Sequence, residues 1–153
     1  MGQVTTYRRL ATAATPRRTY QISVGLMEGF SDKGALHNIK DAERVILHWI
    51  ETRIKAGQMF LSGTLAQQAV LYGIGDQADA HAISEPVAVF SGFVSVRRTP
   101  TPSDDEVDAM LEELASQLGV ALGQVRVNIE NRDTTWVIEA EDTPLPREPH
   151  QSV

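Results

Sequence analysis

The loop of residues 25–38 carries the side chains best suited to chemistry: Glu28, Asp32 and His37, with Asp41 close behind. A histidine beside carboxylates can hold a divalent metal ion or act as base and acid. His37 and Asp41 are four residues apart, so they lie on the same side of a helix only if the helix already includes His37. Neither the glycine spacing nor the lysine of a phosphate-binding loop is present. We therefore expect a ligand site here, with no resident metal ion and no cofactor.

A structural interpretation competes with this one. Asn38 can cap the following helix, and Asp41 suits its first turn because carboxylates are stabilised at helix N-termini. Glu28 and Asp32 are then solvated side chains. The bare N–H groups before Lys40 could instead receive a phosphate or carboxylate. The residues alone leave these alternatives open.

A second group of candidates lies near the C-terminal end, where Arg126 and Asn128 alternate with Val127 and point to one face of a strand. Arginine can grip phosphate or carboxylate groups through two parallel hydrogen bonds. The alternative is an exposed sheet face with salt bridges to an acidic helix. We predict one site built from both groups. Its ligand-binding residues are Glu28, Asp32, His37, Asn38, Arg126, Asn128 and Arg132.

The elements that must position these residues follow from hydrophobic periodicity. Alternating apolar residues predict strands, and apolar residues three and four apart predict helices. Ser103 and Glu106 form a capping-box pattern at the start of the second helix, which is predicted to end at Gly119. The segment 73–85, with Asp76, Asp79 and His81, is predicted to be a polar loop, suited to a lid. The predicted strands are 20–26, 59–72 with a possible break near 66–69, 87–96, 125–129 and 134–140, and the predicted helices are 40–56 and 103–118.

This order contains two strand–helix–strand units, which predicts an α+β fold of the ferredoxin-like type. We expect a βαββαβ core plus an extra C-terminal strand, with two helices on one face of a mainly antiparallel sheet. Val89 and Phe93 are expected on the other face. Trp136 is assigned to that face too, although its alternation with Ile138 also predicts that both point inward. An exposed apolar face is typical of an interface, so we expect a homodimer or larger homo-oligomer.

The overall composition narrows the class of protein. The chain has 153 residues, no cysteine and a net charge of −6. Its length fits one domain. We expect a flexible arginine-bearing leader at 1–18, a single domain at 19–140 and a disordered proline-rich tail at 141–153. The acidic domain argues against nucleic-acid binding, and the lack of a long apolar run argues against a membrane segment. We expect a cytoplasmic protein.

Two resemblances bear on function. The tandem units and the run Leu122-Gly-Gln-Val-Arg-Val127 are similar to the tautomerase fold, whose base is an N-terminal proline. Here the chain begins Met-Gly and the first proline is Pro16, so we reject that chemistry. The opening Tyr20-Gln-Ile-Ser-Val-Gly-Leu-Met-Glu-Gly29, with the His37 stretch before a helix, resembles small proteins of bacterial mobile elements and phages. The resemblance spans most of residues 20–140 and implies a small accessory protein, without supplying an activity.

The sequence therefore predicts a small accessory binding protein, rather than an enzyme, that holds an anionic small molecule such as a nucleotide. One alternative is a metal-assisted hydrolase that uses His37, Glu28 and Asp32. Another is a protein–protein interaction module that uses the sheet face or the acidic second helix and has no small-molecule site.

Overall fold

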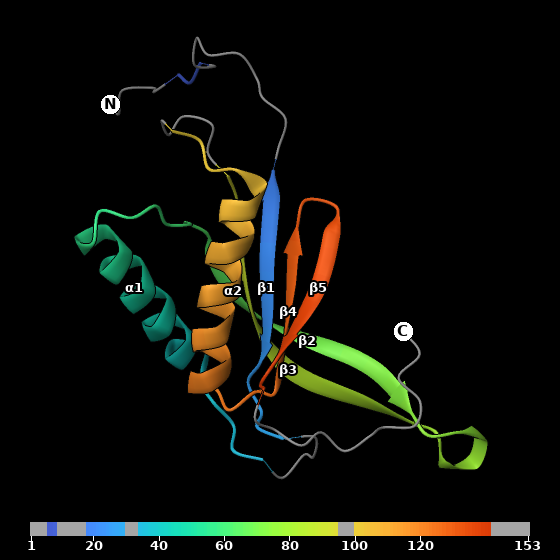
Figure 1. The fold of residues 1–153 in the computed structure, drawn as a ribbon. Coiled ribbons are helices and arrows are strands. Elements are labelled where there is room, and N and C mark those ends of the chain that lie inside the picture. The colour runs from blue at the N-terminus through green and yellow to red at the C-terminus, as the bar shows by residue number, and fades with distance from the viewer. Residues whose placement is uncertain (1–5, 9–17, 30–33, 95–99, 142–153) are drawn as a thin grey trace, which may run out of the picture.

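An antiparallel sheet of five strands forms the centre of the structure, a computed structural model that describes residues 6–8, 18–29, 34–94 and 100–141 (Figure 1). The order of strands across the sheet is β2-β3-β1-β4-β5. Two helices cover one face, so the fold is α+β and ferredoxin-like with an added strand, as predicted. The elements are β1 (Thr19–Gly25), α1 (Ile39–Lys55), β2 (Thr64–Ile74), a short 3-10 turn (Gln77–Asp79), β3 (His81–Phe93), α2 (Asp104–Ala121), β4 (Arg126–Asn131) and β5 (Thr134–Glu139).

The core lies between the sheet and the two helices. On β1, Tyr20, Ile22 and Val24 are almost fully buried, while the residues between them are half-exposed. Such alternation is what a strand with one covered face requires. From the helices, Trp49 of α1 and Leu111 of α2 join the same core. The two strand–helix–strand units thus share one hydrophobic core.

Both helices begin with the caps that the sequence predicts. Asn38 and Asp41 form a capping box on α1, and Ser103 and Glu106 form one on α2. The α2 helix differs from the prediction at its other end, because it continues through Gly119 to Ala121. A Cβ at Gly119 would lie 3.2 Å from a methyl group of Val127. Here glycine therefore permits close packing of the helix on the sheet, instead of ending the helix.

The largest difference from the predicted elements is the hairpin of β2 and β3. Strand β2 runs without interruption through residues 66–69 and pairs with β3 as far as Ile74 and His81. Only residues 75–80 connect the strands, so most of the predicted loop 73–85 is strand. The outer part of this hairpin extends well past the helices (Figure 1). We call its residues 69–86 the arm.

Trp136 lies on the helix side of the sheet, as its alternation with Ile138 predicts, and not on the open face with Val89 and Phe93. It pairs with Ile129, packs against the core and donates a hydrogen bond from Nε1 to Glu112 of α2 at 3.0 Å. Val89 and Phe93 do lie on the open face, because they alternate with Ala88 and Phe90 of the core. Phe93 is 63% exposed.

Candidate functional site

The loop residues Glu28 and His37 meet. His37 Nε2 lies 2.6 Å from Glu28 Oε1, and His37 Nδ1 lies 3.8 Å from Asp41 Oδ2. The loop is closed below them by backbone hydrogen bonds: the Glu28 N–H donates to Ala35 at 2.8 Å, and the His37 N–H donates to Leu26 at 2.7 Å. The pair therefore fastens the base of the loop. Asp32 lies outside the described residues.

Asn38 has a structural role. Its side-chain oxygen accepts a hydrogen bond from the Lys40 N–H at 2.9 Å, and its own N–H donates to Asp41 Oδ2 at 2.9 Å. This hydrogen bond from the Asn38 N–H is the largest cause that lowers the pKa of Asp41 below its ordinary value of 3.8. The nearby charges of Arg44 and His37 lower it further. A carboxylate thus already occupies the helix N-terminus where an anionic ligand was considered.

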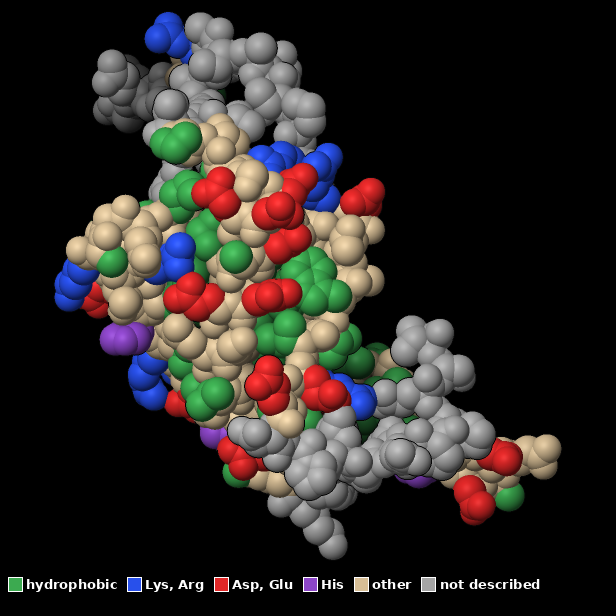
Figure 2. Space-filling model, in the orientation of Figure 1, with side chains coloured by type: hydrophobic (Ala, Val, Ile, Leu, Met, Phe, Trp, Pro, Cys, Tyr) green, Lys and Arg blue, Asp and Glu red, His purple; other side chains and the backbone are tan. Residues whose placement is uncertain are grey.

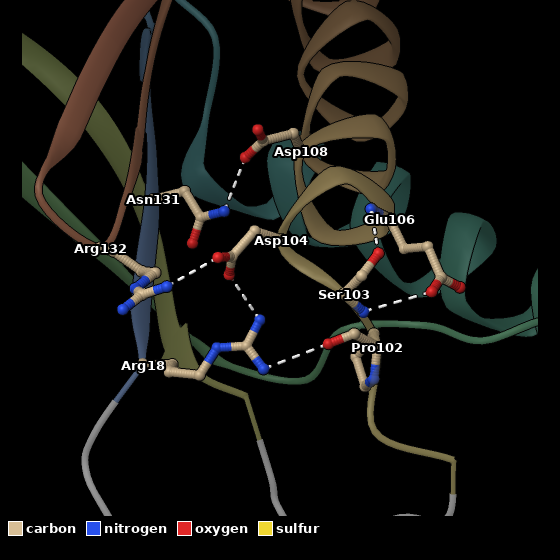
Figure 3. Close-up of polar contacts among 8 residues, drawn as sticks. All are labelled: Arg18, Pro102, Ser103, Asp104, Glu106, Asp108, Asn131 and Arg132. Carbon is tan, nitrogen blue, oxygen red and sulfur yellow. Dashed lines mark hydrogen bonds and ion pairs between the residues drawn. The ribbon is translucent and has the colours of Figure 1, made fainter.

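Arg132 lies at the far end of β4 from Arg126 and faces α2. Its Nη1 lies 2.6 Å from Asp104 Oδ2, and Arg18 Nη2 lies 2.6 Å from Asp104 Oδ1 (Figure 3). Arg18 also donates to the Pro102 carbonyl at 3.1 Å. Hydrogen bonds from Arg132 and then Arg18 lower the pKa of Asp104. These contacts connect the ends of β1 and β4 to the start of α2.

The remaining predicted residues, Arg126 and Asn128, line a cleft of about 470 Å³ on the open face of the sheet. The beginning of the loop, through Met27 and Gly29, lines the same cleft. The cleft thus has lining residues from the loop and from β4, but Glu28, His37, Asn38 and Arg132 of the predicted site are not among them. The cleft is lined by Ser23, Gly25, Met27, Gly29, Val70, Tyr72, Ile74, Ile83, Glu85, Pro86, Val87, Gln124, Val125, Arg126 and Asn128. We call it the open-face cleft.

One wall of the open-face cleft comes from the arm, which sequence reasoning missed. The hydroxyl of Tyr72 donates a hydrogen bond to Glu85 Oε1 at 2.6 Å. The two residues lie on neighbouring strands and point to the same face, since Tyr72 pairs with Ile83 and Val70 pairs with Glu85. The alternation of Val70, Tyr72 and Ile74 was the signal that could have extended the strand.

Two charged side chains, Arg126 and Glu85, line the open-face cleft. Arg126 Nε lies 3.0 Å from Glu139 Oε1, so its charge is balanced. In the part of the chain that the structure describes, no Lys or Arg forms an ion pair with Glu85, whose carboxylate receives only the Tyr72 hydrogen bond. A ligand that enters therefore meets a carboxylate without a partner cation. Nowhere among the described residues do three His, Asp or Glu side chains gather in a metal-binding arrangement.

Comparisons with known proteins find a shared fold. No protein-family model matches the chain, and no curated protein matches it. Among solved structures, the chain is similar to a phage SAM lyase in complex with S-methyl-5'-thioadenosine, with a TM-score of 0.60 and 20% identity over 88% of this chain and 99% of that one. It is also similar to a phage SAM lyase in the apo state, with a TM-score of 0.57 and 16% identity over 87% and 98% of the two chains.

The similarity covers nearly the whole of both phage chains, so it concerns the complete α+β fold. At these identities the likeness shows a common fold, because one fold can host unrelated functions. In the described regions, neither helix has the length and apolar character needed to cross a membrane.

Proposed function

We propose that this protein binds S-adenosylmethionine, or its thioether relative S-methyl-5'-thioadenosine, in the open-face cleft. The observation that carries the proposal is the Glu85 carboxylate, held by Tyr72 in a cleft of about 470 Å³. The fold shared with a phage SAM lyase solved with S-methyl-5'-thioadenosine supports the choice of ligand.

The chemistry of the cleft suits the parts of this ligand. S-adenosylmethionine carries a positive sulfonium sulfur, and the Glu85 carboxylate, which pairs with no Lys or Arg among the described residues, offers it a negative charge. Val70, Ile74 and the Tyr72 ring give an apolar wall for the adenine base. Asn128 is exposed, and its amide can both donate to and accept from a base or a ribose hydroxyl. The volume lies within the range of small-molecule sites, about 300–1,000 Å³.

The charge distribution makes a cationic nucleoside a better ligand than the anionic nucleotide expected from the sequence. That expectation relied on free arginines, but Arg126 faces Glu139 and Arg132 faces Asp104. A phosphate in the open-face cleft would lie near the carboxylates of Glu85 and Glu139. The ligand that we propose is therefore still a nucleoside, but it carries a positive sulfonium group in place of a negative phosphate.

Calorimetric titration with S-adenosylmethionine, S-methyl-5'-thioadenosine and AMP tests this proposal. We expect the first two to bind and AMP to bind more weakly. Glu85→Gln should weaken S-adenosylmethionine binding by about tenfold, which corresponds to the loss of one charge-assisted contact. It should change binding of the uncharged thioether much less. Glu130→Gln, which removes an equal charge from the same sheet face outside the cleft, is the matched control.

Two results would reject the assignment: no binding of either sulfur nucleoside, or equal weakening by Glu85→Gln and Glu130→Gln.

Chromatography of S-adenosylmethionine after incubation with the protein addresses the second candidate function, catalysis. Formation of S-methyl-5'-thioadenosine together with homoserine lactone, faster than without protein, would show a lyase, because the carboxylate of the ligand itself replaces the sulfur as its C–S bond breaks. The shared fold supports this second candidate. Unchanged S-adenosylmethionine in the presence of binding would show a carrier or sequestering protein.

We also propose that a second copy of the chain covers the arm and the open face. Large apolar side chains are exposed on both sides of the arm, among them Val70 at 44%, Leu71 at 74% and Ile74 at 39%. Exposed apolar surface of this kind marks interfaces. Light scattering at several protein concentrations measures the association. A monomer at all concentrations would contradict it.

A further inference from the structure

One side chain of the open-face cleft, that of Gln124, is held in a single orientation. Gln124 lies in the turn between α2 and β4 and lines the cleft. Its Nε2 donates one hydrogen bond to the Met27 carbonyl at 2.7 Å and another to the Leu122 carbonyl at 3.1 Å. Exchanging the amide nitrogen and oxygen would place an acceptor against two carbonyl oxygens, so the direction of this amide is fixed.

Gly25 shows where the oxygen of this amide lies. Residues alternate along β1, and Val24 faces the helices at 2% exposure, so position 25 faces the open side of the sheet. A Cβ at Gly25 would lie 2.5 Å from Gln124 Oε1. Gly25 is not among the glycines with positive φ, so the backbone does not require glycine here. The glycine instead leaves room for the Gln124 amide on the floor of the cleft.

The oxygen of the Gln124 side chain is available to a ligand. In the part of the chain that the structure describes, this side chain takes part only in the two hydrogen bonds donated by Nε2, and neither occupies Oε1. The buried side-chain atoms that lack a partner there belong to Trp49 and Asn131, so Gln124 Oε1 is not enclosed. A fixed carbonyl oxygen accepts from a donor but leaves another acceptor unpaired. Such an atom can therefore select between ligands.

The position of Gln124 relative to the arm indicates which part of the ligand it contacts. Gly25 pairs with Val87 of β3, and Val87 pairs with Gln68 of β2, so two strand spacings, about 10 Å, separate Gly25 from β2. Val70, the next residue of β2 on this face, begins the apolar wall proposed for the adenine base. A purine on this wall spans the distance to Gln124 with one hydrogen bond at its edge. In the space-filling view, the outer end of the arm stands clear of the other described residues, so the wall is open at this end (Figure 2).

We propose that Gln124 Oε1 accepts a hydrogen bond from the exocyclic amino group of adenine, and that the open-face cleft therefore selects adenine nucleosides over hypoxanthine nucleosides. This inference rests on the proposed function, because it concerns the base of the same sulfur nucleosides. Hypoxanthine carries an oxygen where adenine carries its amino group. Two acceptors would then face each other, and the Gln124 amide cannot turn to donate without losing its hydrogen bonds to Met27 and Leu122.

Calorimetric titration with S-methyl-5'-thioadenosine and S-methyl-5'-thioinosine tests this selection, since the two nucleosides differ only in the base. We expect the inosine compound to bind about tenfold to a hundredfold more weakly, the usual effect of leaving a half-buried acceptor unpaired. If neither nucleoside binds, the proposed function fails together with this inference. If both bind equally, only the role of Gln124 fails.

Gln124→Met keeps the length of the side chain and removes the acceptor, so the ratio of the two affinities should approach one. Gln68→Met is the matched control, because it makes the same replacement on the open face at an exposed residue that does not line the cleft. It should keep the ratio of the unchanged protein. A Gln124→Met variant that weakens both nucleosides equally and keeps the ratio would show a structural role only, and would overturn the proposal.

Gly25→Ala tests the same contact from β1. A methyl group there would push the Gln124 amide away from the floor of the cleft, so this variant should also lower the ratio although Gln124 is retained. Thermal unfolding by circular dichroism shows whether each variant is folded, and Gln124→Met decides the question if Gly25→Ala is not. A folded Gly25→Ala variant with the full ratio would contradict the role of the Gln124 oxygen.

Discussion

The two faces of the sheet are built from the same strands but serve different purposes. On β1, Ile22 is fully buried under the helices, whereas its neighbours Gln21 and Ser23 point to the open face and are half-exposed. The helix-side residues give the fold its stability, because burial of apolar surface is the dominant favourable contribution. The open-face residues contribute less to stability and are therefore available to form a ligand site.

Strand β3 shows that the open face is not uniformly polar. Val87 and Val89 are buried there, at 9% and 4% exposure, although they do not belong to the helix-side core. Further out along the arm, Val70 and Ile74 become exposed. The apolar surface thus continues from the sheet onto the arm, where a ligand or a second copy can reach it.

The largest difference between the faces should appear on replacing adjacent residues of β1. Ile22→Ala should lower the free energy of unfolding by about 2–5 kcal/mol, because it leaves a cavity in the core. Ser23→Ala should change it by less than about 0.5 kcal/mol. Urea denaturation of both variants measures the contrast. Similar losses would mean that the open face is as tightly packed as the helix side.

A smaller loss of stability is expected on removing the N-terminal cap of α2. Ser103 accepts a hydrogen bond from the Glu106 N–H at 3.2 Å, so Ser103→Ala removes a cap from α2. We expect a loss of about 1 kcal/mol. Ser103→Asp, which can restore the cap, is the control variant for urea denaturation. If Ser103→Asp loses as much as Ser103→Ala, the cap does not stabilise the layer.

The contacts between the sheet and α2 should be sensitive to pH through Asp104. Arg132 and Arg18 hold the pKa of Asp104 below its ordinary value of 3.8. The stabilisation is therefore complete above that value and is lost as the pH falls through the lower pKa of the folded state. Asp104→Asn should lower the melting temperature modestly at pH 7, and the difference from the unchanged protein should shrink as the pH falls below 3.8.

Asp105→Asn, one residue further along α2, should not reproduce this pH dependence. Thermal unfolding by circular dichroism across the pH range compares the two variants. A constant difference between Asp104→Asn and the unchanged protein at every pH would show that the ion pairs with Arg132 and Arg18 do not contribute.

The smallest change in the stability of the monomer is expected from a substitution on the open face. Phe93 is 63% exposed, so Phe93→Ser at low protein concentration should change the free energy of unfolding by less than about 0.5 kcal/mol. If a second copy covers this face, the loss should grow with protein concentration, since association stabilises the folded state. Thermal unfolding at several concentrations makes this measurement. A large loss that does not depend on concentration would contradict the comparison of the two faces.

Much of the fold could be predicted from the sequence, because local patterns encode it. The alternation at Tyr20, Ile22 and Val24 predicts β1, and the capping boxes predict where both helices start. The arm was predicted poorly because both of its faces are exposed. The alternation of Val70, Tyr72 and Ile74 extends the strand signal only as far as Ile74, and the glycine and acidic residues of 75–79 are typical of a loop. The alternation of Trp136 with Ile138 predicts the inward position of Trp136, but its hydrogen bond to Glu112 depends on α2, which is distant in the chain.

The candidate site shows the same division. The sequence by itself determined β1, both helices, the polar face of β4 with Arg126 and Asn128, and the capping roles of Asn38 and Asp41, since these follow from contacts within a few residues. Only the tertiary structure decided that Glu28 joins His37, that Arg132 joins Asp104, and that Tyr72 and Glu85 form a wall of the open-face cleft. Those contacts depend on the register of paired strands and on packing between segments that are distant in the chain. The hydrophobic periodicity of a sequence specifies neither of these.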